Sequence, residues 1–89
     1  MTYVRPPDIQ DLVRGYEDGE GDSELTQRAR NIYGRIDNYQ NHAAQRKHPD
    51  MLAEARRQRE DMRQVIELIL SRRHAPELEQ YFNRKKTKK

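Results

Sequence analysis

The chain has 89 residues, of which 33% are apolar and 37% are charged, and it contains no cysteine. A chain this short forms one small domain at most, and so little apolar material favours thin helical layers over a large core. The lack of cysteine excludes disulfides and thiolate metal sites. Because the sequence has neither a long apolar run nor a secretory or transit-type N-terminus, we expect a cytoplasmic protein with no membrane partner.

The net charge of +3 is unevenly distributed along the chain. Residues 1–24 carry two basic against seven acidic side chains, whereas residues 25–75 carry eleven against six and residues 76–89 carry five against two. An acidic head on a basic body and tail is typical of proteins whose partner is a polyanion.

Residues 1–22 are predicted to form an acidic N-terminal helix and loop. Pro6 and Pro7 suit the start of a helix, and a cluster of three glycines is expected to end it. One helical face is apolar and consists of Ile9, Leu12, Val13 and Tyr16.

The next segment has the clearest helical pattern, with apolar residues spaced 4, 3, 4, 3 and 4 apart from Leu25 to Ala43. This spacing indicates a helix that packs along another helix. Asp22 or Ser23 is predicted to cap its start. Its end is expected near Lys47, because Pro49 disfavours helical backbone at His48.

A second helix of the same kind is predicted from Pro49 onward, with an apolar row that Arg59 interrupts. Since the turn between the two helices is short, they must run antiparallel as an αα-hairpin. The segment Ala75-Pro76-Glu77 restarts a short last helix. The predicted fold is therefore all-α: residues 23–84 form a long antiparallel hairpin with a short last helix, and residues 85–89 form a basic tail.

The predicted hairpin tip, HAAQRKHPD, places His42, Arg46, Lys47 and His48 near one turn. Cationic and hydrogen-bonding side chains on a projection suit the phosphate oxygens and ribose hydroxyls of a structured RNA. The alternative is a polar turn whose basic residues satisfy a helix dipole.

The third predicted helix is rich in arginine, and Arg56, Arg59 and Arg63 share one of its faces. Arginine suits bidentate phosphate contact; the alternative is a solvated flank balanced by the acids of the same helix. The complete predicted RNA-binding set is Asp22, Ser23, Arg28, Arg35, His42, Arg46, Lys47, His48, Arg56, Arg57, Arg59, Arg63, Arg72 and Arg73.

No catalytic site is predicted. His42 and His48 are six residues apart, which is not the spacing of a helical metal pair. The acids of the N-terminal loop have no nucleophile or histidine nearby, and Gly19 and Gly21 lack the Gly-Lys ending of a phosphate loop. We therefore expect no enzyme activity, metal, cofactor or small-molecule substrate.

Three segments resemble the bacterial ribosomal small-subunit protein fifteen family. LVRGYEDGEGD (residues 12–22) is similar to its first helix and loop, and RIDNYQNH (35–42) is similar to its RINNLTEH. RQVIELILSRRHAPELEQYF (63–82) is similar to its Arg/Lys-rich helix and last helix.

The resemblance implies a mobile first helix on a three-helix body that binds ribosomal RNA at a three-way junction and a nearby helical groove. By position, Asp22 and Ser23 stand in for the family's GDTGS loop, His42 for the histidine of its EH pair, and Lys47 lies in its HKKDHHS turn. The chain departs from the family at HPDMLAEA (48–55), which replaces Asp-His-His-Ser-Arg-Arg-Gly. Either other side chains contact RNA there, or only the family's shape is shared.

Two further hypotheses remain beside a junction-binding ribosomal protein. A helical assembly subunit, for example a phage packaging or head component, would bind neighbouring proteins through its rows of apolar residues and its oppositely charged ends. A DNA-binding regulator fits less well, because a helix-turn-helix uses short helices at a wide angle.

Overall fold

The computed structural model describes residues 2–87 of the chain. Its four helices are α1 (Pro7–Glu17), α2 (Asp22–Gln45), α3 (Pro49–Arg72) and α4 (Pro76–Thr87). The described residues contain no strand, so the predicted all-α fold is confirmed. None of these four helices is both long enough and apolar enough to span a lipid bilayer.

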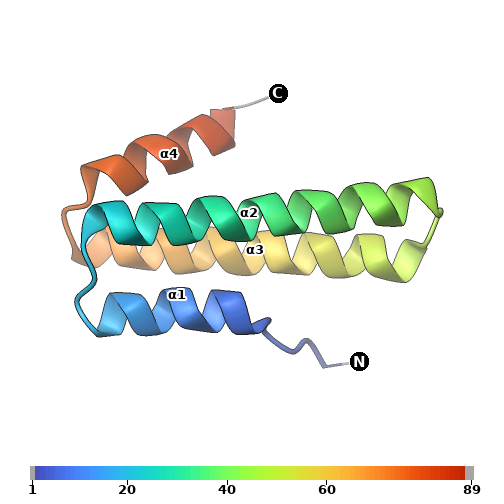
Figure 1. Cartoon of the computed structure of the whole chain (residues 1–89), viewed down its shortest axis with the longest axis horizontal. Coiled ribbons are helices and arrows are strands. Elements are labelled where there is room, and N and C mark those ends of the chain that lie inside the picture. The colour runs from blue at the N-terminus through green and yellow to red at the C-terminus, as the bar shows by residue number, and fades with distance from the viewer. Residues whose placement is uncertain (1, 88–89) are drawn as a thin grey trace.

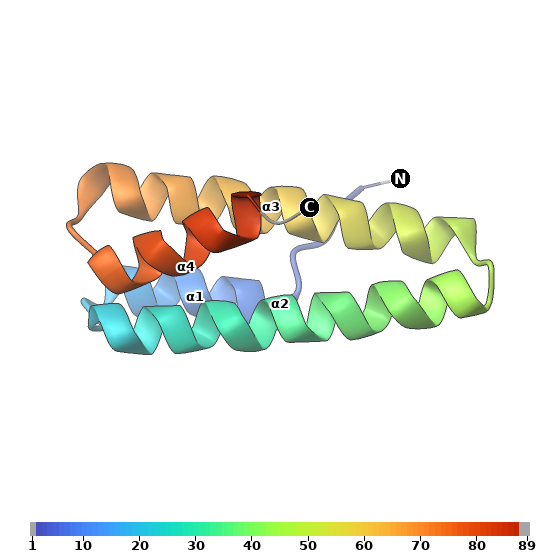
Figure 2. The same cartoon turned by 90° about the horizontal axis from the view of Figure 1, so that it is seen from above.

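Helices α2 and α3 form the predicted antiparallel hairpin, and α1 and α4 pack on its two opposite faces (Figures 1 and 2). The result is three layers, with the hairpin in the middle. Both flanking helices lie beside the open end of the hairpin and stop well short of its tip (Figure 1). The radius of gyration is 13.4 Å, slightly above the ~12 Å expected of a compact chain of this length.

The hydrophobic core lies where the three layers overlap. The predicted apolar rows supply most of it, including Leu25, Ile32 and Ile36 from α2 and Met62 and Ile66 from α3, all buried. Between residues 37 and 54, by contrast, Ala43 alone is buried. The outer half of the hairpin therefore projects with almost no core of its own.

Proline starts three of the four helices, as expected for its fixed φ and missing N–H at the first helical turn. Pro49 also explains the hairpin turn, because His48 before it is held extended (φ −102°, ψ 99°).

Helix α4 is longer than the sequence pattern indicated. It continues to Thr87, so residues 85–87 of the expected basic tail are helical; residues 88–89 lie outside the described residues. The reason is tertiary: the Lys85 side chain packs over the rings of Tyr33 and Tyr81, which stabilises the last turns of α4 against the hairpin.

Candidate nucleic-acid interface

The hairpin tip is built by a helix end, a two-residue turn and a proline-started helix. The N–H of His48 donates to the carbonyl of Ala43 (2.9 Å), and the N–H of Lys47 donates to the carbonyl of Ala44 (3.1 Å). This pair of bonds is the Schellman arrangement that ends many helices, with Lys47 at the position usually held by glycine. Lys47 accordingly has left-handed backbone, with φ of 52°.

The side chains predicted for the tip are all exposed, and they are His42, Arg46, Lys47 and His48. His48 also accepts a long bond from the N–H of Met51 (3.4 Å), so it caps α3. Within the described residues, Arg46 and Lys47 form no ion pair with a carboxylate. The tip thus presents two positive charges without a direct carboxylate partner among residues 2–87, at the end of a projecting rod.

On α3, Arg56, Arg59 and Arg63 lie on one face, as expected. Their interaction partners differ. Arg59 bridges to α2, where Gln40 accepts from its Nε (2.9 Å) and Asp37 accepts from its Nη2. Arg63 pairs with Glu60 and Glu67 on its own helix. Arg56 is exposed and has no ion pair among the described residues.

The Arg63 interactions show how far the charges are compensated. Hydrogen bonds from Arg63 lower the pKa of Glu60, and hydrogen bonds to Glu60 and then Glu67 raise the pKa of Arg63. Because Glu60 and Glu67 flank the Arg63 guanidinium, Arg63 contributes little net charge to the surface.

Arg28 and Arg35 face α1 and serve the fold. The guanidinium of Arg28 donates twice to the Glu20 carboxylate, both bonds 2.7 Å, which lowers the pKa of Glu20 and raises that of Arg28. Arg35 donates to Asp8 (3.0 Å from Nη2) and to Gln58 (2.8 Å). Both predicted RNA contacts are thus ion pairs that fasten the N-terminal segment to α2.

Asp22 and Ser23 are also structural, and the expectation that they cap α2 is corrected. Asp22 instead accepts from the backbone N–H groups of Glu77 (2.8 Å) and Leu78 (2.9 Å), so it caps α4. The hydroxyl of Ser23 donates to the Glu77 carboxylate (2.7 Å). At the start of α2, the backbone N–H of Gly21 donates to Glu24.

Arg72 and Arg73 end α3 at the open end of the hairpin. They lie about 36 Å from the tip along α3, at 1.5 Å of rise per residue. Arg57 points to yet another side, where its closest carboxylate is Glu54 at 3.8 Å. The fourteen predicted residues therefore do not form one surface.

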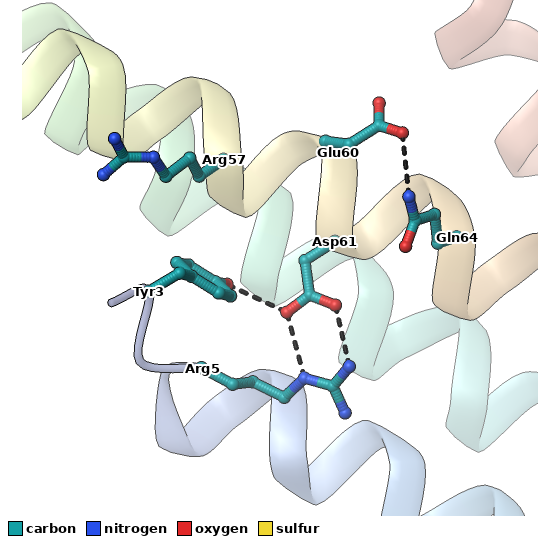
Figure 3. Close-up of a pocket in the computed structure, with 6 residues that line it drawn as sticks. All are labelled: Tyr3, Arg5, Arg57, Glu60, Asp61 and Gln64. Carbon is teal, nitrogen blue, oxygen red and sulfur yellow. Dashed lines mark hydrogen bonds and ion pairs between the residues drawn. The ribbon is translucent and has the colours of Figure 1, made fainter. Parts of the chain in front are cut away.

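A hollow of about 460 Å³ lies between the N-terminal segment and α3 (Figure 3). The Asp61 carboxylate, only 8% exposed, accepts two bonds from Arg5 (3.0 and 2.9 Å) and one from the Tyr3 hydroxyl (2.8 Å). Burial and the bond to Asp61 raise the pKa of Tyr3. These bonds to Asp61 hold the N-terminal segment against α3.

A basic and aromatic surface that the sequence pattern did not reveal surrounds α4. Arg30 lies over the Tyr81 ring (4.9 Å to its centroid), and Lys85 Nζ lies 5.0 Å from the centroid of Tyr33. The two rings are themselves 6.0 Å apart. The four-residue spacing of Tyr81 and Lys85 is the sequence signal for this surface. Because residues 85–89 were predicted to form a tail, Lys85 was not placed on a helical face with Tyr81.

Among residues 2–87, no group of three or more His, Cys, Asp and Glu side chains is arranged to hold a metal ion. No protein-family model, curated protein or solved structure matches the chain.

Proposed function

We propose that the chain is an RNA-binding structural protein whose hairpin tip contacts a folded RNA junction. The main support is the projecting tip, where Arg46 and Lys47 are exposed and form no ion pair within residues 2–87, beyond the layers of α1 and α4. A rigid rod with a cationic end can enter a groove or junction that a compact globule cannot. The resemblance of three segments to ribosomal small-subunit protein fifteen makes ribosomal RNA the RNA we propose.

The backbone of Lys47 supports this proposal. A residue with a Cβ in left-handed backbone is less stable than glycine by ~1 kcal/mol or more, yet lysine occupies the position. A strained backbone conformation is a reason to suspect a functional side chain. We infer that the ammonium group at this turn contacts phosphate.

The first prediction concerns binding to a synthetic RNA three-way junction, followed by fluorescence anisotropy. If about three phosphates are neutralised, affinity falls roughly 40-fold between 50 and 200 mM salt. Lys47→Gly is expected to weaken binding several-fold while raising the free energy of unfolding by about 0.5 kcal/mol, because glycine relieves the strain at a modest entropic cost.

Lys47→Arg is the matched control, since it keeps both the charge and the strained backbone. It should bind like the unmodified chain. A protein that ignores the junction at 50 mM salt, or a Lys47→Gly variant with undiminished affinity, contradicts the proposal. Co-sedimentation with purified small ribosomal subunits tests the ribosomal part separately.

A further inference from the structure

We propose that the surface around α4 is a second RNA contact. It binds phosphodiester groups of the same RNA whose junction contacts the hairpin tip. We call it the α4 face; its cationic groups are Arg30, Arg59 and Lys85, and they lie beside Tyr33 and Tyr81. This inference rests on the proposed RNA-binding function and adds a surface to it.

Two hollows beside α4 are lined by basic and aromatic side chains. One, of about 140 Å³, is lined by Arg30, Tyr81, Arg84 and Lys85; the other, of about 190 Å³, is lined by Tyr33, Arg59, Arg63, Phe82 and Lys85. Neither lining includes a carboxylate, and Lys85 belongs to both. Adjacent basic side chains around a hollow attract a phosphate by charge and hydrogen bonding.

The hollows on the opposite face of the hairpin differ in the charge of their lining. The hollows beside α1 are lined by acids as well as Arg28: Asp8 and Asp11 in one, Glu20 and Glu24 in the other. Because α1 and α4 lie on opposite sides of the hairpin (Figure 1), the charges that line the hollows favour a polyanion on the α4 side.

The cationic groups of the α4 face are held in place before any ligand binds. Arg30 rests on Tyr81, and Lys85 lies over Tyr33 with the Asp37 carboxylate 3.7 Å away. Arg59 is fixed through Nε and Nη2, while its Nη1 donates no hydrogen bond within the described residues. Pre-ordered side chains lose less conformational entropy on binding.

The α4 face also connects with the tip. Arg56 shares the side of α3 that carries Arg59 and Arg63, and it lies about 10 Å nearer the tip than Arg63 at 1.5 Å per residue. An RNA backbone that contacts the tip can therefore follow this row to α4.

The test compares two single charge reversals against the same synthetic RNA junction. Arg30→Glu alters the α4 face at an exposed residue with no ion pair among those described. Arg14→Glu makes the same change in net charge on α1, where the side chain is 72% exposed. We expect Arg30→Glu to weaken binding about ten-fold and to lower the salt slope by about one, and Arg14→Glu to change affinity less than two-fold.

Equal effects of the two reversals would overturn the inference, because net charge alone would then explain them.

Lys85→Gln provides a second readout. It should weaken binding three-fold or more while the far-ultraviolet circular dichroism spectrum remains helical, and unchanged affinity counts against the α4 face. If Lys47→Gly weakens binding and the α4 variants do not, the inference alone fails. If the unmodified chain does not bind, the proposed function itself fails.

Discussion

Arg35 lies between two helices, where its guanidinium donates to the Asp8 carboxylate of α1 and the Gln58 amide of α3. These bonds occupy all three guanidinium nitrogens of Arg35, although 38% of its side chain stays exposed. Arg46 is chemically identical but has no carboxylate partner within the described residues. The role of each arginine therefore depends on the acids that the fold brings beside it, which its sequence neighbours do not reveal.

Tyr33 is a residue whose ionisation reports on the same packing. Only 5% of it is exposed, and burial, followed by the nearby Tyr81, raises the pKa of its hydroxyl to about 12. Since an unfolded tyrosine ionises near 10, the protonated form favours the folded state. Its contribution to stability is complete below pH 10 and is lost as the pH rises through about 12.

We therefore predict that ultraviolet titration at 295 nm detects a tyrosine component with a pKa near 12 that disappears in Tyr33→Phe, beside the components of Tyr3 and Tyr81, whose pKa values burial also raises. The Tyr39→Phe variant is the control, because Tyr39 is only half-buried and its removal should leave the component intact. A late transition of unchanged amplitude in Tyr33→Phe would contradict the assignment.

At the scale of the helix, α4 depends on a residue 54 positions before its start. The carboxylate of Asp22 supplies acceptors for the N–H groups of Glu77 and Leu78, which have no partner within their own helix. Asp22 lies in the first turn of α2 and so also joins the two helices at the open end of the hairpin. The sequence indicated a capping residue here but not the helix that it caps.

We predict that Asp22→Ala lowers the free energy of unfolding by about 1 kcal/mol, with a range of roughly 0.5–2, as measured by urea denaturation. Ser23→Ala, which removes one exposed bond to the Glu77 side chain, is expected to cost less than half as much. Comparable losses in both variants would indicate that the cap contributes no special stability to α4.

At the scale of the whole molecule, charge is divided between the faces. Helix α1 and its loop place acids on one side, whereas Arg30, Arg59 and Lys85 lie around α4 on the other. This division gives the molecule an electric dipole between its two faces. We expect it to orient the hairpin as it approaches RNA, in addition to increasing the rate of association.

The surface offers little for self-association through apolar contacts. Val4 and Leu68 are the large hydrophobic side chains exposed within residues 2–87, and two isolated residues do not form an interface. Light scattering is therefore expected to give the mass of one chain, 10.7 kDa, without nucleic acid. A stable oligomer of defined size would instead favour the assembly-subunit hypothesis.

The sequence alone determined the helices and their pairing. Apolar spacing and prolines are local signals, and the short turn at Pro49 permits only an antiparallel hairpin. The extension of α4 could not be predicted in this way, since its last turns pack on Tyr33, which lies 52 residues earlier than Lys85.

Only the tertiary structure decided which charged residues remain available. The predicted RNA contacts Arg28 and Arg35 pair with Glu20 and Asp8, while Asp22 and Ser23, predicted from the family resemblance, bond to α4. Arg30 and Lys85 were not predicted as RNA contacts and lie on the α4 face. The physical reason is that helical spacing specifies the face on which a side chain lies, whereas ion pairing depends on distances across helices that only packing establishes.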